Sequence, residues 1–447
     1  MLNNVFEEIS VNKIFGFFLV FLTFTNCSLD TKSGLWTKNQ TIKKEKNLKE
    51  KKVIELFKES KTLEKEFNSN VKIRLNSKSK NNSFVNNFDN NNGRVNYDGE
   101  LKSVSRFKYS KIENFEQYEP DLIFDKDNII FFDNKGSILK FNNFSKLIWK
   151  KNFYSKKERK KKPFLFFANN SKTLIVADTI AKFYAINIAT GDLLWSKNNV
   201  APFNSQIKIY KDKFFVVDFE NILRCYSINN GNEIWTFKTE KSIIKSQKKL
   251  SVVIINGKVY FSNSIGDISA VDIETGNLIW QTPTQTSNVY ESSFFLKTSD
   301  LIADPNTILF SNNYNEFFSL DILYGSINWK QNINSTLRPT LIDQLIFTIT
   351  MEGFLVVIDN NNGNIIRITN IFDRFNKKKR SKIKPEGFIV GNKNIYLTTS
   401  NGRLLIINIL SGKTEEILKI DRERISRPFV LNQNLFIIKN NAIIKLN

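Results

Sequence analysis

Few side chains in this protein are suited to catalysis or metal binding, because the 447-residue chain contains no histidine and only two cysteines, Cys27 and Cys225. The absence of histidine excludes a Ser-His-Asp triad, an imidazole base and any zinc or haem site that depends on an imidazole ligand. Two cysteines are too few for a disulfide framework or a four-cysteine metal site. These sites are excluded by residue type, and we predict no catalytic residues, no metal site and no cofactor.

The N-terminal region contains a short apolar run, Ile14–Phe24, which ends just before Cys27. Eleven residues are too few for a transmembrane helix, which needs about 20. The length is typical of the apolar part of a signal peptide, and Lys13 supplies the positive charge in front of it. The sequence predicts a signal peptide over residues 1–26.

A cysteine directly after such a run resembles the lipobox of bacterial lipoproteins. Phe24 and Asn26 depart from that pattern, which prefers Leu and a small residue at these two positions. The resemblance implies that Cys27 is lipidated and, with Ser28 beside it, that the protein is sorted to the outer membrane on its periplasmic side. The alternative is an ordinary free thiol near a cleaved signal. Cys225 lies in an apolar, strand-like run and is expected to be a small buried residue.

The net charge of +22 is concentrated in three Lys-rich segments, residues 38–80, 140–162 and 371–384, whose net charges are +8, +9 and +6. Arginine, which makes the bidentate contacts to phosphates and bases, is scarce, with 13 residues against 53 lysines. This placement indicates solvated loops rather than a nucleic-acid surface. Residues 27–93 have the composition of a flexible or weakly helical tether.

From residue 121 onward the chain is periodic. One unit runs from Val259 to Trp280 and contains an apolar strand, a polar turn, an alternating strand, a glycine turn and a short strand that ends in tryptophan. The turn glycines are Gly191, Gly231, Gly276, Gly325, Gly363 and Gly412, and the tryptophans are Trp149, Trp195, Trp235, Trp280 and Trp329. Arg367 and Glu416 fill the tryptophan position in two later units. We expect these tryptophans to pack between neighbouring units rather than to bind a ligand.

Repeats of about 40–50 residues with four short strands each predict a β-propeller. Eight strands begin near residues 129, 174, 214, 259, 308, 345, 395 and 435. The last unit lacks an outer strand, and a ring with an unpaired edge cannot close. The sequence therefore predicts an all-β, eight-bladed propeller over residues 94–447, closed by a strand from within about residues 94–112.

The repeat Ala270–Trp280 resembles the Trp-docking motif A-x-D-x-x-T-G-x-x-x-W of the pyrroloquinoline-quinone (PQQ) propeller superfamily, and Ala185–Trp195 departs from it at Asn187. Within that superfamily, Phe261–Ser287 and Ser426–Pro428 resemble BamB, the family of outer-membrane β-barrel assembly lipoproteins, in its α-proteobacterial form. The resemblance implies a non-catalytic scaffold that helps outer-membrane proteins to fold and insert. The implied partners are the barrel-forming assembly subunit, other assembly lipoproteins and nascent outer-membrane proteins.

The resemblance also implies where the barrel subunit binds, which is on the loops after the third and fourth blades. The family pattern Leu-x-Leu-Arg falls on Ile243, Ile244 and Lys245, and the family pattern Asp-x-Asp falls on Asp300 and Ile302, so its second acid is absent. The alternative for these residues is an ordinary loop between blades.

Two other functions remain open from the sequence. The quinoprotein dehydrogenases of the same superfamily resemble one another in an adjacent cysteine pair, which this chain lacks, and in bound Ca²⁺ with an aspartate base. The other alternative is a propeller that binds sugars, peptides or nucleic acid.

Overall fold

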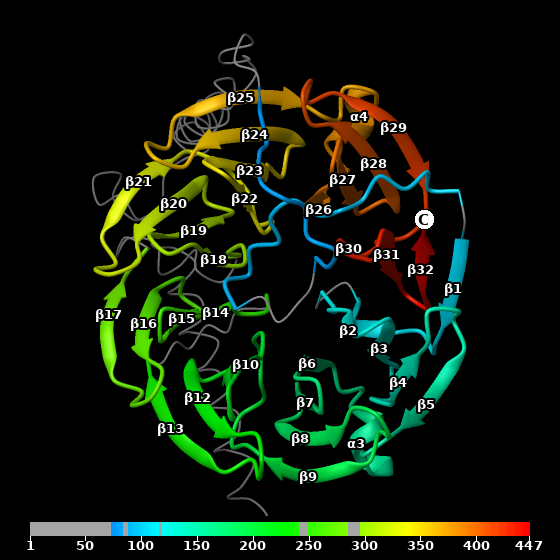
Figure 1. The fold of residues 1–447 in the computed structure, drawn as a ribbon, viewed down its shortest axis with the longest axis vertical. Helices are drawn as coiled ribbons and strands as arrows, with labels where there is room; N and C mark the ends of the chain where they lie inside the picture. Colours follow the sequence, from blue (N-terminus) through cyan, green and yellow to red (C-terminus); the bar gives the residue numbers. More distant parts are fainter. Residues whose placement is uncertain (1–72, 84–87, 103, 116–118, 241–247, 285–295) are drawn as a thin grey trace, which may run out of the picture. The chain divides into compact units, whose positions relative to one another are not determined.

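Eight four-stranded antiparallel sheets are arranged as the blades of a ring in the computed structural model (Figure 1). The structure describes residues 73–83, 88–102, 104–115, 119–240, 248–284 and 296–447, all of which belong to one unit, Glu64–Asn447. The predicted fold class, an eight-bladed all-β propeller, is confirmed. The predicted signal peptide lies outside the described residues.

The first four blades follow one another directly along the chain. Blade 1 consists of β2 (Ile123–Asp125), β3 (Asn128–Phe132), β4 (Ile138–Phe141) and β5 (Leu147–Lys151), and blade 2 of β6 (Leu165–Asn169), β7 (Thr173–Asp178), β8 (Lys182–Asn187) and β9 (Leu193–Asn198). Blade 3 consists of β10 (Lys208–Tyr210), β11 (Lys213–Val217), β12 (Ile222–Ser227) and β13 (Glu233–Lys238), and blade 4 of β14 (Val252–Ile255), β15 (Lys258–Ser262), β16 (Ile268–Asp272) and β17 (Leu278–Thr282).

The last four blades keep the same plan, and the eighth takes one strand from the other end of the propeller sequence. Blade 5 consists of β18 (Ile302–Ala303), β19 (Thr307–Asn312), β20 (Glu316–Asp321) and β21 (Ile327–Gln331), and blade 6 of β22 (Thr340–Ile342), β23 (Leu345–Ile349), β24 (Phe354–Asp359) and β25 (Ile365–Asn370). Blade 7 consists of β26 (Pro385–Val390), β27 (Asn394–Thr399), β28 (Arg403–Asn408) and β29 (Thr414–Lys419), and blade 8 of β30 (Pro428–Leu431), β31 (Asn434–Lys439), β32 (Ala442–Leu446) and β1 (Val104–Lys108).

The ring closes where β1 pairs antiparallel with β32, from Val104 opposite Leu446 to Lys108 opposite Ala442. Phe107 on β1 is fully buried and packs edge-on against Phe141 of blade 1. The closing strand expected within residues 94–112 is therefore present. It removes the unpaired edge that blade 8 would otherwise expose.

Each blade buries its second and third strands on both faces, because these strands pack between two neighbouring blades. On β15, for example, the four residues after Lys258 are all buried. The first strands are short, with two to six residues, and face the centre of the ring, while the fourth strands lie at its rim (Figure 1). Cys225, on the third strand of blade 3, is buried as expected.

The tryptophans join neighbouring blades. In blade 4 the register shifts between Ala270 and Val271, so that Trp280 turns inward toward blade 5, where its Nε1 donates a hydrogen bond to the carbonyl of Ile322 at 3.2 Å. The indole packs on Gly325, where a Cβ would lie 2.5 Å from ring atoms. The same packing on a glycine repeats as Trp149 on Gly191, Trp195 on Gly231, Trp235 on Gly276 and Trp329 on Gly363. The expected packing role of the repeat is thus visible in its contacts.

In the part of the chain that the structure describes, two blade-to-blade connections carry short basic helices. One is α3 (Lys156–Lys160), which begins with a capping box formed by Ser155 and Glu158, and the other is α4 (Lys377–Arg380), capped by Asn376. A 3-10 turn, η2 (Glu113–Phe115), leads from β1 into blade 1. None of the described residues of α3 or α4 is buried, in agreement with the solvated basic loops expected here. Lys140, in the same expected loop segment as α3, is instead buried on β4 and paired with Asp125.

A segment before β1, which we call the strap (residues 73–83 and 88–102), crosses the middle of the ring (Figure 1). Asn90 is 2% exposed, and its Nδ2 donates to Oε1 of Gln206 at 2.8 Å, just before the first strand of blade 3. The same Nδ2 donates to the carbonyl of Leu301 at 3.0 Å, just before the first strand of blade 5. The amide of Val95 donates to Val390 of blade 7 at 2.8 Å. The strap thereby binds several first strands together.

The strap corrects one sequence-based expectation, the tether over residues 27–93. Within that range Ile73 and Asn90 are buried, and the amide of Ser83 donates to Val430 of blade 8 at 2.8 Å. The described part of the expected tether therefore packs on the propeller, because its asparagines and serines bond to the first strands. Residues 27–72 lie outside the described residues.

Candidate functional site

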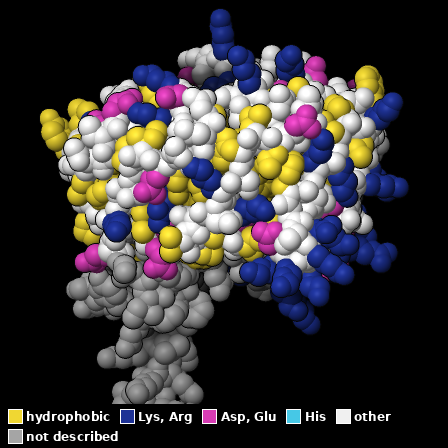
Figure 2. Space-filling view, turned by 90° about the horizontal axis from the view of Figure 1, so that it is seen from below, with side chains coloured by type: hydrophobic (Ala, Val, Ile, Leu, Met, Phe, Trp, Pro, Cys, Tyr) yellow, Lys and Arg dark blue, Asp and Glu magenta, His cyan; other side chains and the backbone are white. Residues whose placement is uncertain are grey.

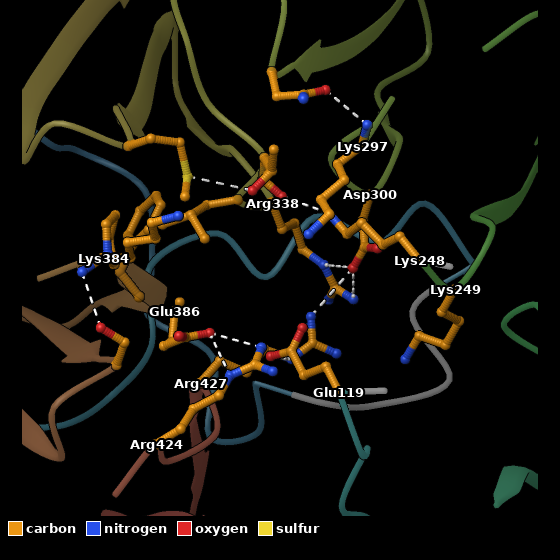
Figure 3. A pocket seen from close by; sticks show the side chains of 18 of the residues that line it. Glu119, Lys248, Lys249, Lys297, Asp300, Arg338, Lys384, Glu386, Arg424 and Arg427 are labelled. Carbon is orange, nitrogen blue, oxygen red and sulfur yellow. Dashed lines mark hydrogen bonds and ion pairs between the residues drawn. The ribbon is translucent and has the colours of Figure 1, made fainter. Parts of the chain in front are cut away.

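The centre of the ring contains a cavity of about 950 Å³ lined by charged side chains (Figure 3). Asn92 of the strap forms part of its wall, and Asn313 and Ser400, in turns between second and third strands, lie on its lining as well. The strap contacts the turns between first and second strands, such as Asp343, at the other end of the blades. We call the end near Asn313 and Ser400 the mouth and the end covered by the strap the floor.

A recurring serine just before the first strand positions the side chains of this cavity. In blade 8 the Ser426 hydroxyl donates to the Arg427 carbonyl at 2.7 Å and accepts from the amide of Ile438 at 2.9 Å. Ser299 makes the same two bonds in front of blade 5, to the carbonyl of Asp300 and from the amide of Ser311. The serine thus ties the entry of the first strand to the second strand, and the following residue lines the cavity.

Asp300 lies at the centre of an ion-pair network. Its Oδ2 accepts hydrogen bonds from Nη2 of Arg338 at 2.6 Å and from Nη1 of Arg427 at 3.2 Å. Asp121 pairs with Arg427 and with Lys249. Burial by itself raises the pKa of Asp300, but Arg338 and Arg427 outweigh it and hold this pKa well below its usual range. Both carboxylates are therefore ionised at neutral pH.

A second pair lies beside this network, between Arg424 and Glu386, with Nη2 and Oε2 2.7 Å apart. Burial raises the pKa of Glu386 to about 7, although Arg424 opposes the shift. Glu119 lies close by, with its Oε1 3.8 Å from Nε of Arg427. The Glu386 carboxylate on this side of the cavity is thus only partly ionised at neutral pH.

Three further lysines line the cavity. Lys248 donates from its Nζ to the carbonyl of Thr336 at 2.5 Å, and burial lowers its pKa to about 8. Lys297 and Lys384 are exposed and belong to different connections, before blade 5 and before blade 7. Figure 3 shows them on opposite sides of the opening.

The side chains of this cavity can bind a ligand by charge and hydrogen bonds. Its lining has seven lysines and arginines and four aspartates and glutamates. Among the described residues, no group of three or more histidine, cysteine, aspartate or glutamate side chains is placed to hold a metal ion. Within the same part of the chain, no helix is long and apolar enough to span a membrane.

The residues predicted for lipidation and partner binding are only partly described. Cys27, Ile243, Ile244 and Lys245 lie outside the described residues, so their roles stay predictions. Asp300 is 7% exposed and lies in the cavity with Arg338 and Arg427, not on an open loop surface. The cavity was not predicted from the sequence, although the serine followed by a charged residue before blades 5 and 8 is a signal that could have indicated it.

A second candidate surface is the rim of the ring. The fourth strands of blades 1 to 5 have one sheet neighbour each, and they expose apolar side chains beside the inward-turned tryptophans. These side chains are Leu147, Ile148, Leu193, Leu194, Ile234, Leu278, Ile279 and Ile327, which are 41–54% exposed. Figure 2 shows apolar side chains spread between polar ones on the side of the ring in view, with lysines and arginines gathered at one edge.

Comparisons with curated proteins find several assembly factors. The chain is 23% identical over 275 residues to the outer membrane protein assembly factor BamB of Moranella endobia. The aligned region covers 60% of this chain and 68% of that protein. It is 24% identical to BamB of Legionella pneumophila over 34% of this chain and 35% of that protein. For BamB of Yersinia pestis the identity is 22%, over 50% of this chain and 58% of that protein. The chain thus spans from about a third to just over two thirds of the length of these relatives.

Comparison with solved structures supports the fold. The crystal structure of BamB from Moraxella catarrhalis has a TM-score of 0.61 at 13% identity and covers 77% of this chain and 100% of that one. A quinohemoprotein alcohol dehydrogenase from Pseudomonas putida HK5 has a TM-score of 0.60 at 10% identity, covering 82% of this chain and 80% of that one. At such identities the likeness concerns the fold alone.

The family assignment rests on a match to a sequence model of the family rather than on these pairwise comparisons. The model described as outer membrane protein assembly factor BamB matches residues 134–369, just over half of the chain. The matches do not support the narrower α-proteobacterial assignment expected from the sequence. The chain belongs to the BamB family of PQQ-like β-propellers.

Proposed function

We propose that this protein is a non-catalytic scaffold of the machinery that assembles β-barrel proteins in the outer membrane. In this proposal the lipid on Cys27 anchors it to the periplasmic face of that membrane. Membership of the BamB family supports the proposal. The observation that carries it is the rim, where five successive blades offer unpaired strand edges and exposed apolar side chains.

The rim is suited to binding chains rich in β-strands. A fourth strand such as β17 has one sheet neighbour, and an extended client strand could add to its other edge by main-chain hydrogen bonds. Leu278 and Ile279 are 48% and 41% exposed beside that edge and would supply apolar contacts. Nascent outer-membrane proteins are clients with this chemistry.

For the barrel-forming subunit we propose the loops after blades 3 and 4. The first contains the predicted contact residues Ile243, Ile244 and Lys245. Asp300 ends the second loop, and its side chain is already bonded to two arginines. We therefore propose that Asp300 fixes the end of the loop rather than touching the partner. A substitution such as Asp300→Arg would add a further cation to a buried network and remove one of its carboxylates, so it is unsuitable as a test of binding.

Affinity isolation of the tagged full chain from detergent-solubilised outer membranes tests the proposal. We expect recovery of a barrel protein with periplasmic repeats. Ile244→Asp should weaken this association by more than about 2 kcal/mol, the usual threshold for a central contact residue. The matched control is Leu410→Asp, at an apolar residue 65% exposed in a turn of blade 7, which should leave the association unchanged.

Two outcomes would contradict the proposal. One is a purified chain that carries a bound quinone, visible by absorbance and mass spectrometry, with no barrel protein. The other is a loss of association that is equal for Ile244→Asp and Leu410→Asp.

A further inference from the structure

The connections that carry the two short helices lie at the mouth end of the ring. The strands of a blade alternate in direction, so the fourth strand ends at the same end as the turn between the second and third strands. The helix α3 lies between blades 1 and 2, and α4 lies between blades 6 and 7. Figure 1 places them on either side of blades 7, 8 and 1, and we call the mouth end of these three blades, together with residues 155–162 and 373–384, the basic arc.

Both helical segments of the basic arc carry a high positive charge. Residues 155–162 contain six lysines and arginines against one glutamate, a net charge of +5, and residues 373–384 contain seven against one aspartate, a net charge of +6. Five of the six cations in the first segment and six of the seven in the second are exposed. The glutamate, Glu158, is already engaged, because its carboxylate accepts from the amide of Ser155 at 2.7 Å and lies 3.4 Å from Nζ of Lys182.

Contacts with the propeller hold both segments in place. Next to α3, Nζ of Lys182 donates to the carbonyl of Phe153 at 2.7 Å. In the α4 segment, Nε of Arg380 donates to the carbonyl of Phe375 at 2.6 Å, and Ile383 is buried in the hydrophobic core. The exposed lysines are therefore carried by ordered turns at one end of the ring.

The cations of α3 repel one another. Lys156 and Lys160 are four residues apart, and Lys157 and Lys160 are three apart. At these spacings like charges lie side by side on a helix and destabilise it. An anionic surface placed against α3 relieves this repulsion, so the segment favours such a partner.

The mouth end between the two helices adds further positive charge. Lys135 is exposed in the turn between β3 and β4, and Lys111 is exposed beside Ile112, whose amide donates to Asn440 in the turn between β31 and β32. Three nearby acids are paired with lysines. These pairs are Glu113 with Lys162, Asp133 with Lys150, and Asp421 with Lys439.

The distribution of these cations fits a broad anionic surface. They are spread over three blades at exposed positions, and most are lysines, whose ammonium groups act as point charges without the fixed fork geometry of arginine. Clusters of about four to eight lysines and arginines are typical of protein segments that bind anionic lipids. Figure 2 shows lysines and arginines gathered in this way at one edge of the ring.

We propose that the basic arc binds the surface of a membrane that contains anionic phospholipids. Blades 3 and 4 lie on the other side of the ring from the basic arc (Figure 1), so the loops proposed for the barrel subunit do not compete with this contact. The inference is independent of the scaffold function, because vesicles without any partner protein test it.

Flotation with vesicles of phosphatidylcholine alone, or of phosphatidylcholine with one third phosphatidylglycerol, tests this inference. The full chain with Cys27→Ser is used, so that no lipid anchor hides the contribution of the lysines. Each lysine near an anionic surface strengthens binding roughly fivefold. We expect at least about a hundredfold tighter binding to the anionic vesicles at low salt, and a decrease of this preference as salt is added, since the Debye length falls to about 3 Å at 1 M.

Three variants locate the contact, and each removes four positive charges. The α3 variant combines Lys156→Gln, Lys157→Gln, Lys160→Gln and Lys161→Gln. The α4 variant combines Lys377→Gln, Lys378→Gln, Lys379→Gln and Lys382→Gln. The control combines Lys146→Gln, Lys172→Gln, Lys393→Gln and Lys413→Gln, which are exposed in turns at the floor end of blades 1, 2 and 7.

The α3 and α4 variants should each reduce the preference for anionic vesicles about tenfold or more, and the control should reduce it less than about threefold. Three results would overturn the proposal: equal binding to the two kinds of vesicle, a loss confined to one of the two helix variants, or a loss in the control as large as theirs. Equal binding is also the result expected if the lysines serve an acidic protein or a nucleic acid instead.

Lysine labelling followed by mass spectrometry gives an answer that does not depend on the variants. Anionic vesicles should protect Lys156 and Lys378 from acetylation, relative to neutral vesicles, and leave Lys172 and Lys393 unprotected. Equal protection at all four lysines would contradict a contact through the basic arc.

Discussion

The contact between Trp280 of blade 4 and Gly325 of blade 5 offers a double-mutant test of how the ring is held together. Trp280 is 9% exposed, and its indole donates to the carbonyl of Ile322. We expect Trp280→Ala to lower the free energy of unfolding by about 3–5 kcal/mol, the range for truncating a buried aromatic side chain. Loss of both the packing on Gly325 and the hydrogen bond accounts for this cost.

Gly325→Ala perturbs the same contact from the other side. Gly325 has φ +72°, and its added Cβ would lie 2.5 Å from Cδ2 and Cε3 of Trp280. The left-handed backbone costs a residue with a Cβ about 1–2 kcal/mol, and overpacking costs about 1–3 kcal/mol. Gly257→Ala is the matched control, because Gly257 has φ +71° and a Cβ added there would meet no atom of the described residues within 4 Å. It should show the backbone cost alone.

The double variant separates packing from backbone strain. Without the indole, the alanine at position 325 no longer clashes with the ring, so the double variant should be about 1–3 kcal/mol more stable than the sum of the single effects predicts. Urea unfolding followed by tryptophan fluorescence and by circular dichroism measures the four free energies. Strict additivity, or equal costs for Gly325→Ala and Gly257→Ala, would refute the role assigned to the Trp–Gly contact.

Further predictions concern anchoring, pH and charge. Cys27→Ser should release the protein from the outer membrane, and a variant that still fractionates with that membrane after a high-salt wash would contradict lipidation. Burial raises the pKa of Asp178 from 3.8 to about 6 in the folded state. The folded state therefore holds this proton more tightly than the unfolded state does, and the stability that protonation contributes at low pH is lost as the pH rises through 6. The stability of Asp178→Asn relative to the native chain should therefore increase by about 3 kcal/mol between pH 3 and pH 8, and a constant difference in thermal melting would contradict this. Asp300→Asn should cost about 3–5 kcal/mol, because it leaves buried arginines without their carboxylate, and a melting temperature like that of the native chain would show that the network does not stabilise the ring. Neutralising the lysines of residues 156–162 should reduce partner affinity at physiological salt by less than half of the effect of Ile244→Asp, and a larger loss in a binding assay would favour diffuse attraction.

The architecture was predictable because each blade repeats a local pattern. The strand starts expected near Ile129, Leu174 and the six later positions fall on the second strands, and in blades 2 to 5 a glycine turn and a tryptophan follow at fixed spacing. The first strands were missed because they are short, with only Ile302–Ala303 in blade 5. A first strand pairs with the second strand of its blade, and it has no periodic sequence of its own that would reveal this pairing. In blade 1 the turn has no glycine, and Ser145 adopts the positive φ of 60° instead.

The cavity and the strap were harder to predict because both depend on contacts between distant residues. Asp300 and Arg427 are 127 positions apart, and Asp121 is 306 positions from Arg427. Each lies alone in an otherwise ordinary connection, so no continuous motif marks them. The strap has the asparagine and serine content of a linker. The hydrogen-bond partners of a residue such as Asn90 lie beside the first strands of the ring, far away in the sequence. Composition alone cannot distinguish such a segment from a solvated tether.

Site-specific photo-crosslinking in cells tests the proposed scaffold function most directly. A photoreactive amino acid at Ile244, in the loop after blade 3, should crosslink to a barrel protein with periplasmic repeats. The control position is Asn361, exposed in the turn between β24 and β25, at the opposite end of the blades from the loops that connect one blade to the next. The proposal predicts a crosslink at position 244 and none at 361. Crosslinks at 361 alone, or none at 244 in a protein that is folded and membrane-bound, would contradict it.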